Sequence, residues 1–404
     1  MTPTTTAGSP AATVASAFTR PGLKFVVVRP RLLFPADCGA QTHSAQMLKQ
    51  LNREHSVTLV AGRLRSDTDE DVEATAAFCE NLITVPVNRG SSEGDAARAL
   101  ARTVAGVYKT LKPDALICDS IYACEALRQA PNAPFILFQH HPEAAVLHQR
   151  AARAHSLLDK MKLNWRAWRM RSFEEKECRR ALCVIAVSDA DRFHFQNDFG
   201  AEHCEVARAG VDTAYFSPVR TPVRTNNIVF TGSLDWPANQ DAVEHFVEHI
   251  FPLIQKESPN VMFSIVGRNA TARILKLGER PGINVTDAVN DVRPYVYNAK
   301  VYVAPQRMSG GTRLSVLQAL AMGKAIVTTS AGSEGLMAEH GRNILIADAP
   351  ADFARETVSL LRDDSRRRML EQNARSLAER AHTWAHSARD FSDICTRAVA
   401  HAIS

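Results

Sequence analysis

Short apolar segments typical of strands alternate with longer helical segments along the chain, and this alternation occurs twice. The first series opens with a strand at Lys24–Val28, a helix over about 41–53 and a strand at Val57–Ala61. Parallel strands need a long crossover, usually a helix, so the alternation predicts a parallel sheet covered by helices on both faces. The other elements expected in this series are strands at Leu82–Val87, Ala115–Cys118, Phe135–Gln139 and Cys183–Ser188, and a helix at Gly94–Leu111.

A polar stretch that contains Pro218 and Pro222 interrupts the alternation between residues 213 and 227. The second series starts with a strand at Ile228–Thr231 and a helix whose apolar residues, from Ala242 to Ile254, share one face. Its other expected strands are Val261–Val266, Ile283–Val285, Val301–Val303, Ala325–Thr329 and Ile344–Ile346. A chain of 404 residues is too long for one ordinary core. The predicted class is α/β, with two doubly wound, Rossmann-like domains facing each other across a cleft.

The domain boundaries follow from these breaks in the pattern. Residues 1–20 are rich in Thr, Ala, Ser and Pro, without the charged start and apolar core of a secretory signal, so they predict a disordered tail. Apolar residues from Trp384 to Ala398 at near-helical spacing predict a final helix. The expected organisation is a tail over 1–22, a first domain over 23–212, a linker over 213–227, a second domain over 228–382 and a C-terminal helix over 383–404.

Composition argues against several classes of function. The formal net charge of +5 is too small to indicate a nucleic-acid partner without a clustered patch. The eight cysteines form neither a C-x-x-C pair nor a Cys/His metal spacing, which favours reduced thiols and a cytoplasmic location. No run approaches the roughly 18 apolar residues of a membrane-spanning helix.

A glycine-rich turn, Gly310-Gly311-Thr312-Arg313, separates the strand at Val301–Val303 from a helix. Two glycines allow the backbone to approach a ligand, and the first amides of a helix are free to donate to an anion. Arg313 in the first turn opposes the helix dipole unless a bound anion reverses the local charge. A phosphate-binding turn and an ordinary helix cap with a solvated arginine both fit this stretch.

Three more strand ends in the second series carry residues suited to a sugar nucleotide: Gly232-Ser233, Gly267-Arg268 and Thr286–Asp291. Parallel topology places all such ends, and the glycine turn, on one rim. The arginine fork of Arg268 matches phosphate geometry. Gln318, in the helix behind the turn, is either a ribose ligand or a surface glutamine.

These segments resemble the donor domain of retaining glycosyltransferases of the family-4 type, which have the GT-B fold and include bacterial sugar transferases with a Gly-Gly-Thr-Arg-Leu donor loop. The resemblance is carried by NIVFTGSLDWPANQDAVEHF, FSIVGR, INVTDAVNDVRPY and GGTRLSVLQALAMGKAIVTTSAGSEGL, with CVIAVSDADRF and AGVDTAYFSP before them. It covers about Lys24 to Trp384. It implies transfer of a sugar from a nucleoside diphosphate, expected to be UDP or GDP, to a hydroxyl acceptor, with no metal and no resident cofactor.

The resemblance also implies roles for particular residues. The donor would be bound by Gly39, Gly232, Ser233, Arg268, Val289, Ser309, Gly310, Gly311, Thr312, Arg313 and Gln318. His140, Arg268 and Arg313 would be the catalytic residues, with His140 close to the donor sugar and the acceptor. No side chain is expected as a general base, because in the family the leaving phosphate helps to take the acceptor proton.

The chain departs from the family pattern at several positions. Gly310 and Gln318 stand where many members have two glutamates, and Ser315 and Asp287 replace a frequent lysine and glycine. Ala238 and Asn239 stand near an absent basic pair. Two alternatives therefore stay open: a non-hydrolysing sugar-nucleotide epimerase, and a catalytically degenerate sugar-nucleotide-binding partner protein.

Three further patterns in the sequence each allow more than one interpretation. Asp67-Thr68-Asp69 matches a metal-binding D-x-D motif but lies in an acidic run typical of a solvated loop. His141 and Glu143, beside His140, are weak candidates for acceptor contacts. Residues 148–181 are basic and aromatic, which predicts either a solvated helix with inward-packed tryptophans or a peripheral contact with an anionic membrane at its inner face. The members of that cluster are Arg150, Arg153, Lys160, Lys162, Trp165, Arg166, Trp168, Arg169 and Arg171.

Overall fold

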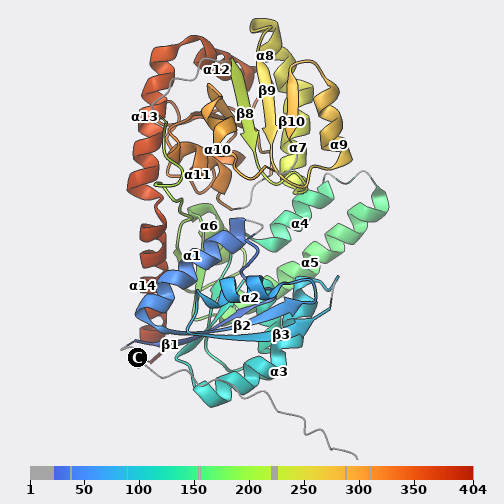
Figure 1. Cartoon of the computed structure of the whole chain (residues 1–404). Coiled ribbons are helices and arrows are strands. Elements are labelled where there is room, and N and C mark those ends of the chain that lie inside the picture. The colour runs from blue at the N-terminus through green and yellow to red at the C-terminus, as the bar shows by residue number, and fades with distance from the viewer. Residues whose placement is uncertain are drawn as a thin grey trace, which may run out of the picture.

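The computed structural model describes most of the chain, and two parallel sheets organise it (Figure 1). The described residues are 22–36, 39–88, 90–152, 154, 156–219, 226–286, 289–308 and 311–403. The expected tail up to residue 21, linker residues 220–225, and Cys38, Arg153, Asp287, Ser309 and Gly310 lie outside this part.

The first domain contains a seven-stranded parallel sheet of order β3-β2-β1-β4-β5-β6-β7. Its strands are β1 (Lys24–Arg29), β2 (Ser56–Leu64), β3 (Asn81–Val87), β4 (Ala115–Asp119), β5 (Phe135–Phe138), β6 (Cys183–Ala186) and β7 (Cys204–Val206). Its helices are α1 (Gly39–Glu54), α2 (Asp69–Ala76), α3 (Glu93–Leu111), η1 (Ile121–Gln129), α4 (Glu143–Ala152), α5 (Leu157–Arg180) and α6 (Asp189–Asn197). Strand β7 was not predicted, because three residues are too few to show the alternation or apolar run of a strand.

Alternate side chains of β1 enter two different cores, one on each face of the sheet. Phe25 and Val27 join the cluster beneath α1, whereas Val26 and Val28 join the cluster beneath α3 and η1. A strand buried on both faces reads as a continuous apolar run, because no face meets water. The predicted α/β class with a helix-covered parallel sheet is therefore confirmed.

The second domain contains a six-stranded parallel sheet of order β10-β9-β8-β11-β12-β13. Its strands are β8 (Asn227–Thr231), β9 (Met262–Val266), β10 (Ile283–Thr286), β11 (Val301–Ala304), β12 (Ala325–Thr328) and β13 (Leu345–Ile346). Its helical segments are α7 (Pro237–His245), η2 (Phe246–Ile250), α8 (Phe251–Glu257), α9 (Ala272–Leu275), η3 (Lys276–Glu279), α10 (Arg293–Tyr297), α11 (Leu314–Ala321), η4 (Ala331–Ser333), α12 (Pro350–Arg362) and α13 (Asp364–Ala381).

The helix expected around Ala242–Ile254 is interrupted by a π-helical turn over Phe246–Ile250. Pro252 follows this turn within the first residues of α8. Proline has no amide hydrogen to donate four residues back and clashes with the preceding turn, so the helix widens locally instead of continuing regularly.

The tryptophans of α5 do not pack inward, which corrects one of the two interpretations of this segment. Trp165 and Trp168 are exposed, whereas Ala167, Glu174 and Cys178 fill the inner face of the helix. Residues three or four apart on a helix share a face, so the face that packs on the protein is already occupied by these other side chains.

The final helix, α14 (Trp384–Ile403), lies beside α1 against the first domain, although α13 before it belongs to the second (Figure 1). Phe391 and Ile394 enter the core shared with Phe25 and Val27. Where the chain returns, Val211 and Thr383 form a parallel bridge, and the Val211 amide donates to the His382 carbonyl at 2.7 Å. The chain therefore crosses between the domains twice, with the two crossings side by side.

His382 is buried at this crossing and held in its neutral form. Its Nε2 accepts from the Met337 amide at 3.3 Å, so Nδ1 is the nitrogen that donates, to the Ala209 carbonyl at 3.4 Å. Burial lowers the pKa of His382 to about 4, even though the bond to Ala209 acts to raise it. A second proton on Nε2 would point at the Met337 amide hydrogen.

Acid is therefore expected to weaken the fold through His382. The unfolded chain has a histidine pKa of about 6.5, so it takes up this proton below that pH while the folded protein does not until about pH 4. The contribution of the neutral His382 to the free energy of unfolding is present above pH 6.5. It is lost as the pH decreases, by about 2 kcal/mol at pH 5. Denaturant unfolding at pH 7.5 and 5 measures this loss, and His382→Gln should lose less. An equal loss in both proteins would contradict the assignment.

Candidate functional site

The four loops expected to bind a donor lie at one edge of the second sheet. β10, β9, β8 and β11 are neighbours and all parallel, so the loops after them leave the same carboxyl edge. Two of the loops are joined directly, because the Gly232 amide donates to Val266 at 3.0 Å and the Leu234 amide donates to Arg268 at 2.9 Å. A Cβ atom at Gly267 would lie 1.9 Å from the Gly232 carbonyl oxygen, so only glycine allows this approach.

Arg268 and Ser233 meet across these joined loops. The Arg268 Nε donates to Ser233 Oγ at 3.4 Å. From α7, Asn239 donates to the Ser233 carbonyl and Gln240 donates to the Leu234 carbonyl, each at 2.9 Å. Asn239, which stands near the position of the basic pair that the chain lacks, therefore supports the backbone of the loop.

The described part of the glycine turn packs against the first domain. Gly311 has φ +74°, and a Cβ atom there would lie 2.8 Å from the His140 carbonyl oxygen, so both conformation and space require glycine. Thr312 Oγ1 donates to the Val187 carbonyl at 3.5 Å. The turn thus brings the N-terminus of α11 next to the loops after β5 and β6.

Arg313 occupies the N-cap position of α11 and lines a cavity between the domains. Its Nη2 donates to the Met308 carbonyl at 2.6 Å, while its Nε has no hydrogen-bond partner among the residues that the structure describes. Burial lowers the pKa of Arg313, although Glu334 and Asp191 act in the opposite direction. An unpaired buried donor beside helix amides is suited to an anion. The cavity, of about 20 Å³, is lined by His141, Val146, Arg150, Trp236, Pro237, Ala238, Met308 and Arg313.

In the first domain, three strand ends and α1 contribute to one buried polar network. Arg29 ends β1, Asp119 ends β4, and His140 follows β5, three neighbouring strands of the sheet. Asp119 forms an ion pair with Arg29 through one carboxylate oxygen and lies 3.1 Å from His140 Nε2 through the other. Ser44 Oγ of α1 is 3.3 Å from the same nitrogen. His140 is thus brought together with residues that the sequence did not single out.

His140 is neutral in this network at neutral pH. Burial, followed by the charges of Arg29 and His141, lowers its pKa to about 3. Because Nε2 faces a carboxylate, the neutral ring is assigned the tautomer in which Nε2 donates to Asp119. A neutral, fixed imidazole can orient a hydroxyl, whereas it supplies no permanent positive charge.

The pKa of His141 is shifted upward, in the opposite direction to that of His140. His141 Nε2 is 2.8 Å from Glu143, and although burial disfavours its charge, the interactions with Glu143 raise the pKa of His141. Glu174 of α5, fully buried, accepts the backbone amides of Glu143 at 2.7 Å and Ala144 at 2.9 Å. Gln139 donates to the His141 carbonyl at 2.8 Å. These bonds fix the loop that carries both histidines.

Three of the remaining expected donor residues, Gly39, Val289 and Gln318, lie in the described part of the chain. At the start of α1, a Cβ atom on Gly39 would be 3.2 Å from Leu314 Cδ1, so this loop reaches α11. Val289, after β10, packs partly buried against the core under α10 and α11. Gln318 is partly buried in α11. Ser309 and Gly310 belong to the residues that the structure does not describe.

Arg29 and Asp119 are the residues that the sequence interpretation missed. Each is a charged residue that directly ends an apolar strand, KFVVVR and ALICD. A charged residue at a strand end does not by itself indicate a functional site, since charged residues often follow strands. The pairing of Arg29 with Asp119 can be inferred only when the strand order is known, because β1 and β4 are adjacent although 90 residues separate the two side chains.

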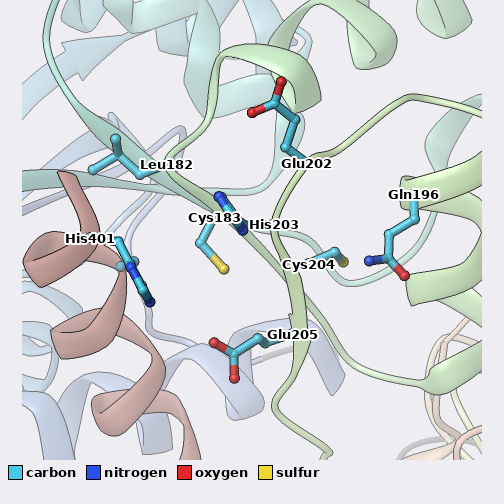
Figure 2. A pocket seen from close by; sticks show the side chains of 9 residues that line it. Leu182, Cys183, Gln196, Glu202, His203, Cys204, Glu205 and His401 are labelled. Carbon is cyan, nitrogen blue, oxygen red and sulfur yellow. The ribbon is translucent and has the colours of Figure 1, made fainter. Parts of the chain in front are cut away.

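A larger cavity lies away from all of these residues. Its volume is about 220 Å³, and β6, β7 and α14 enclose it (Figure 2). The rings of His203 and His401 stack there with centroids 6.2 Å apart. Within the described ranges, no group of three or more His, Cys, Asp or Glu side chains is arranged to hold a metal ion.

Two other patterns have structural explanations. Asp67-Thr68-Asp69 begins α2, where Thr68 and Asp71 form a capping box. The seven described cysteines are buried and free of disulfides.

Comparison with known families finds a match in each domain of the chain. Residues 38–215 match the family model described as Glycosyltransferase Family 4, and residues 225–363 match that described as Glycosyl transferases group 1. Each of the two domains thus matches a different glycosyltransferase family model. Within the described residues, no helix is long and apolar enough to cross a membrane.

Curated relatives match the chain over part of its length. A 44.6 kDa uncharacterised protein of the Klebsiella pneumoniae cps region is 24% identical over 44% of this chain and 50% of its own length. The D-inositol 3-phosphate glycosyltransferase of Corynebacterium kroppenstedtii is 26% identical over 54% of this chain and 53% of its own. The chain thus spans about half the length of the curated relatives it matches.

Solved structures match the chain over nearly its whole length. Sucrose-phosphate synthase of Thermosynechococcus elongatus superposes with a TM-score of 0.74 at 14% identity, covering 94% of this chain and 100% of that one. Anabaena HepE in complex with UDP-glucose gives a TM-score of 0.66 at 15% identity, with 93% and 100% covered. These superpositions establish that the chain shares the two-domain GT-B fold. At identities this low, they establish the fold alone.

Proposed function

We propose that the protein is a retaining glycosyltransferase that moves a sugar from a nucleoside diphosphate, with UDP as the first candidate, to a hydroxyl acceptor. Arg313 carries this proposal: it lines a cavity bounded by both domains, its buried Nε has no hydrogen-bond partner among the described residues, and it lies at the N-terminus of a helix. The HepE structures in complex with UDP-glucose and with UDP support the choice of nucleotide.

In the proposed reaction, Arg313, Arg268 and the first amides of α11 stabilise the charge that develops on the departing diphosphate. These groups replace a metal in that role. His140 orients a hydroxyl of the donor sugar or of the acceptor, and Asp119 fixes the imidazole for this task. The leaving phosphate takes the acceptor proton, so the proposal requires no side-chain base.

The proposal is tested with a panel of nucleotide sugars, each with and without candidate acceptors. Slow hydrolysis of one donor, faster with an acceptor that becomes glycosylated with retention at the anomeric carbon, is the expected result. Inversion of the sugar on its nucleotide, or tight binding without any turnover, would overturn it.

Gln318 offers a separate test of the ribose site. A carboxylate accepts hydrogen bonds from hydroxyls more strongly than an amide does, so Gln318→Glu should tighten donor binding by ~1 kcal/mol. Gln318→Ala should weaken it by a similar amount. Calorimetric titration with the donor identified by the panel measures both, and unchanged affinity in the two variants would remove Gln318 from the site.

A further inference from the structure

The outer face of α5 carries large apolar side chains that the protein leaves in solvent. Their exposed fractions are 80% for Leu157, 67% for Leu158, 70% for Met161, 57% for Trp165 and 67% for Trp168. We call these five residues the α5 stripe. Single exposed apolar side chains are ordinary on a protein surface, but a contiguous group of this kind marks an interaction site.

Helical geometry places the α5 stripe on one side of the helix. At about 100° per residue, its five members fall within about a third of the circumference. The opposite side is the one that packs on the protein, through Ala167, Glu174 and Cys178. The helix therefore has one face that is covered by the first domain and a second, apolar face without a covering element in the described part of the chain.

Cations border the stripe on both sides. The same spacing puts Lys160 and Arg171 along one edge and Lys162, Arg166 and Arg169 along the other, and all five are exposed. The Arg169 guanidinium also lies 4.8 Å from the Trp165 ring centre. Asp159 is the single acidic residue between residues 157 and 171. Apolar and aromatic side chains between rows of Lys and Arg match the boundary between lipid headgroups and acyl chains.

We propose that the α5 stripe docks the protein on an anionic lipid surface, with the apolar side chains inserted among the headgroups and the flanking cations paired with lipid phosphates. The rows of Lys and Arg beside the stripe favour an anionic membrane over a second copy of the chain. A second copy of the chain would bring the same rows of cations against each other, whereas an anionic membrane attracts each of them.

The docked face is linked to the candidate site. At its other end, α5 holds the N-terminus of α4 through Glu174, and Val146 and Arg150 of α4 line the cavity that contains Arg313. Docking would thus seat the cavity close to the lipid surface, where a membrane-anchored acceptor would be reached. This last step rests on the proposed function, whereas docking itself does not.

Sedimentation of the full chain with vesicles tests the proposal without any nucleotide sugar, so its result is separate from that of the transfer assay. Binding is expected to vesicles of phosphatidylglycerol and phosphatidylcholine, to weaken with added salt, and to be at least tenfold weaker with phosphatidylcholine alone. The variant Leu157→Ser/Trp165→Ser/Trp168→Ser should bind at least tenfold more weakly. All three positions are exposed, so its fold should be unchanged, which circular dichroism can verify.

Phe193→Ser is the matched control, because Phe193 is 63% exposed but lies on α6, and it should bind as the wild type does. Absence of wild-type binding at low salt would overturn the proposal. So would undiminished binding of the triple variant, or a wild-type dimer in solution that the triple variant dissociates.

Discussion

Replacing Asp119 by alanine is expected to lower the free energy of unfolding by about 3–5 kcal/mol, the cost of removing one partner from a buried ion pair. The Asp119 side chain is 1% exposed and serves two partners, Arg29 and His140. Without the carboxylate, the Arg29 guanidinium stays in the interior and loses its ion pair with Asp119. Denaturant unfolding of the wild type and Asp119→Ala measures the loss.

Two further variants make this expectation specific. Asp114→Ala removes an exposed carboxylate at the start of the same strand, which accepts the Lys24 amide at 2.7 Å, and should cost about 1 kcal/mol or less. The pair Arg29→Met/Asp119→Leu removes both charges and should recover much of the loss. A deficit in the double variant as large as in Asp119→Ala would contradict the account.

Replacing Arg313 by alanine is expected to weaken nucleotide-sugar binding by ~1.5–3 kcal/mol, roughly 10- to 150-fold, as for loss of a charge-assisted contact. Arg313 provides both the charge and an unpaired Nε beside the N-terminus of α11. Isothermal titration with UDP or the preferred donor measures the change.

Arg342→Ala is the control for this titration, because Arg342 is an exposed arginine of the same domain that pairs with Glu339. Its donor affinity should equal that of the wild type. Arg313→Lys keeps the charge but loses the planar fork, so an intermediate affinity is expected. If Arg313→Ala binds the donor as tightly as the wild type, the proposed diphosphate site is wrong.

The fold was predictable because its signals are local. Strands such as β1 and β4 are continuous apolar runs, and the intervening helices show their own period, so the doubly wound class follows from the sequence. The rim of four loops followed as well, since parallel strands all end at the same edge. The boundaries shifted by one to three residues where polar ends such as Arg29 and Asp119 extend a strand.

The buried network and the α5 stripe could not be derived in the same way. Arg29, Asp119 and His140 depend on the order β1-β4-β5, a long-range property that no local pattern encodes. The sequence left two interpretations of Trp165 and Trp168 open, inward packing or a membrane contact, and the inner position on α5 is taken by other residues, such as Ala167. Which of two faces is covered depends on the neighbouring elements.

The close approach of Gly311 to the His140 carbonyl keeps the two domains in contact near the cavity beside Arg313. The cavity beside Arg313 holds about 20 Å³, roughly the space of a single water molecule, whereas ligand sites commonly measure about 300–1,000 Å³. A diphosphate can reach Arg313 only if the cavity widens, so donor binding is thermodynamically linked to the movement that widens it. The free energy that favours the narrow form of the cavity opposes donor binding and lowers the donor affinity. A substitution that weakens the contact between Gly311 and His140 without touching the ligand should therefore make the donor bind more tightly.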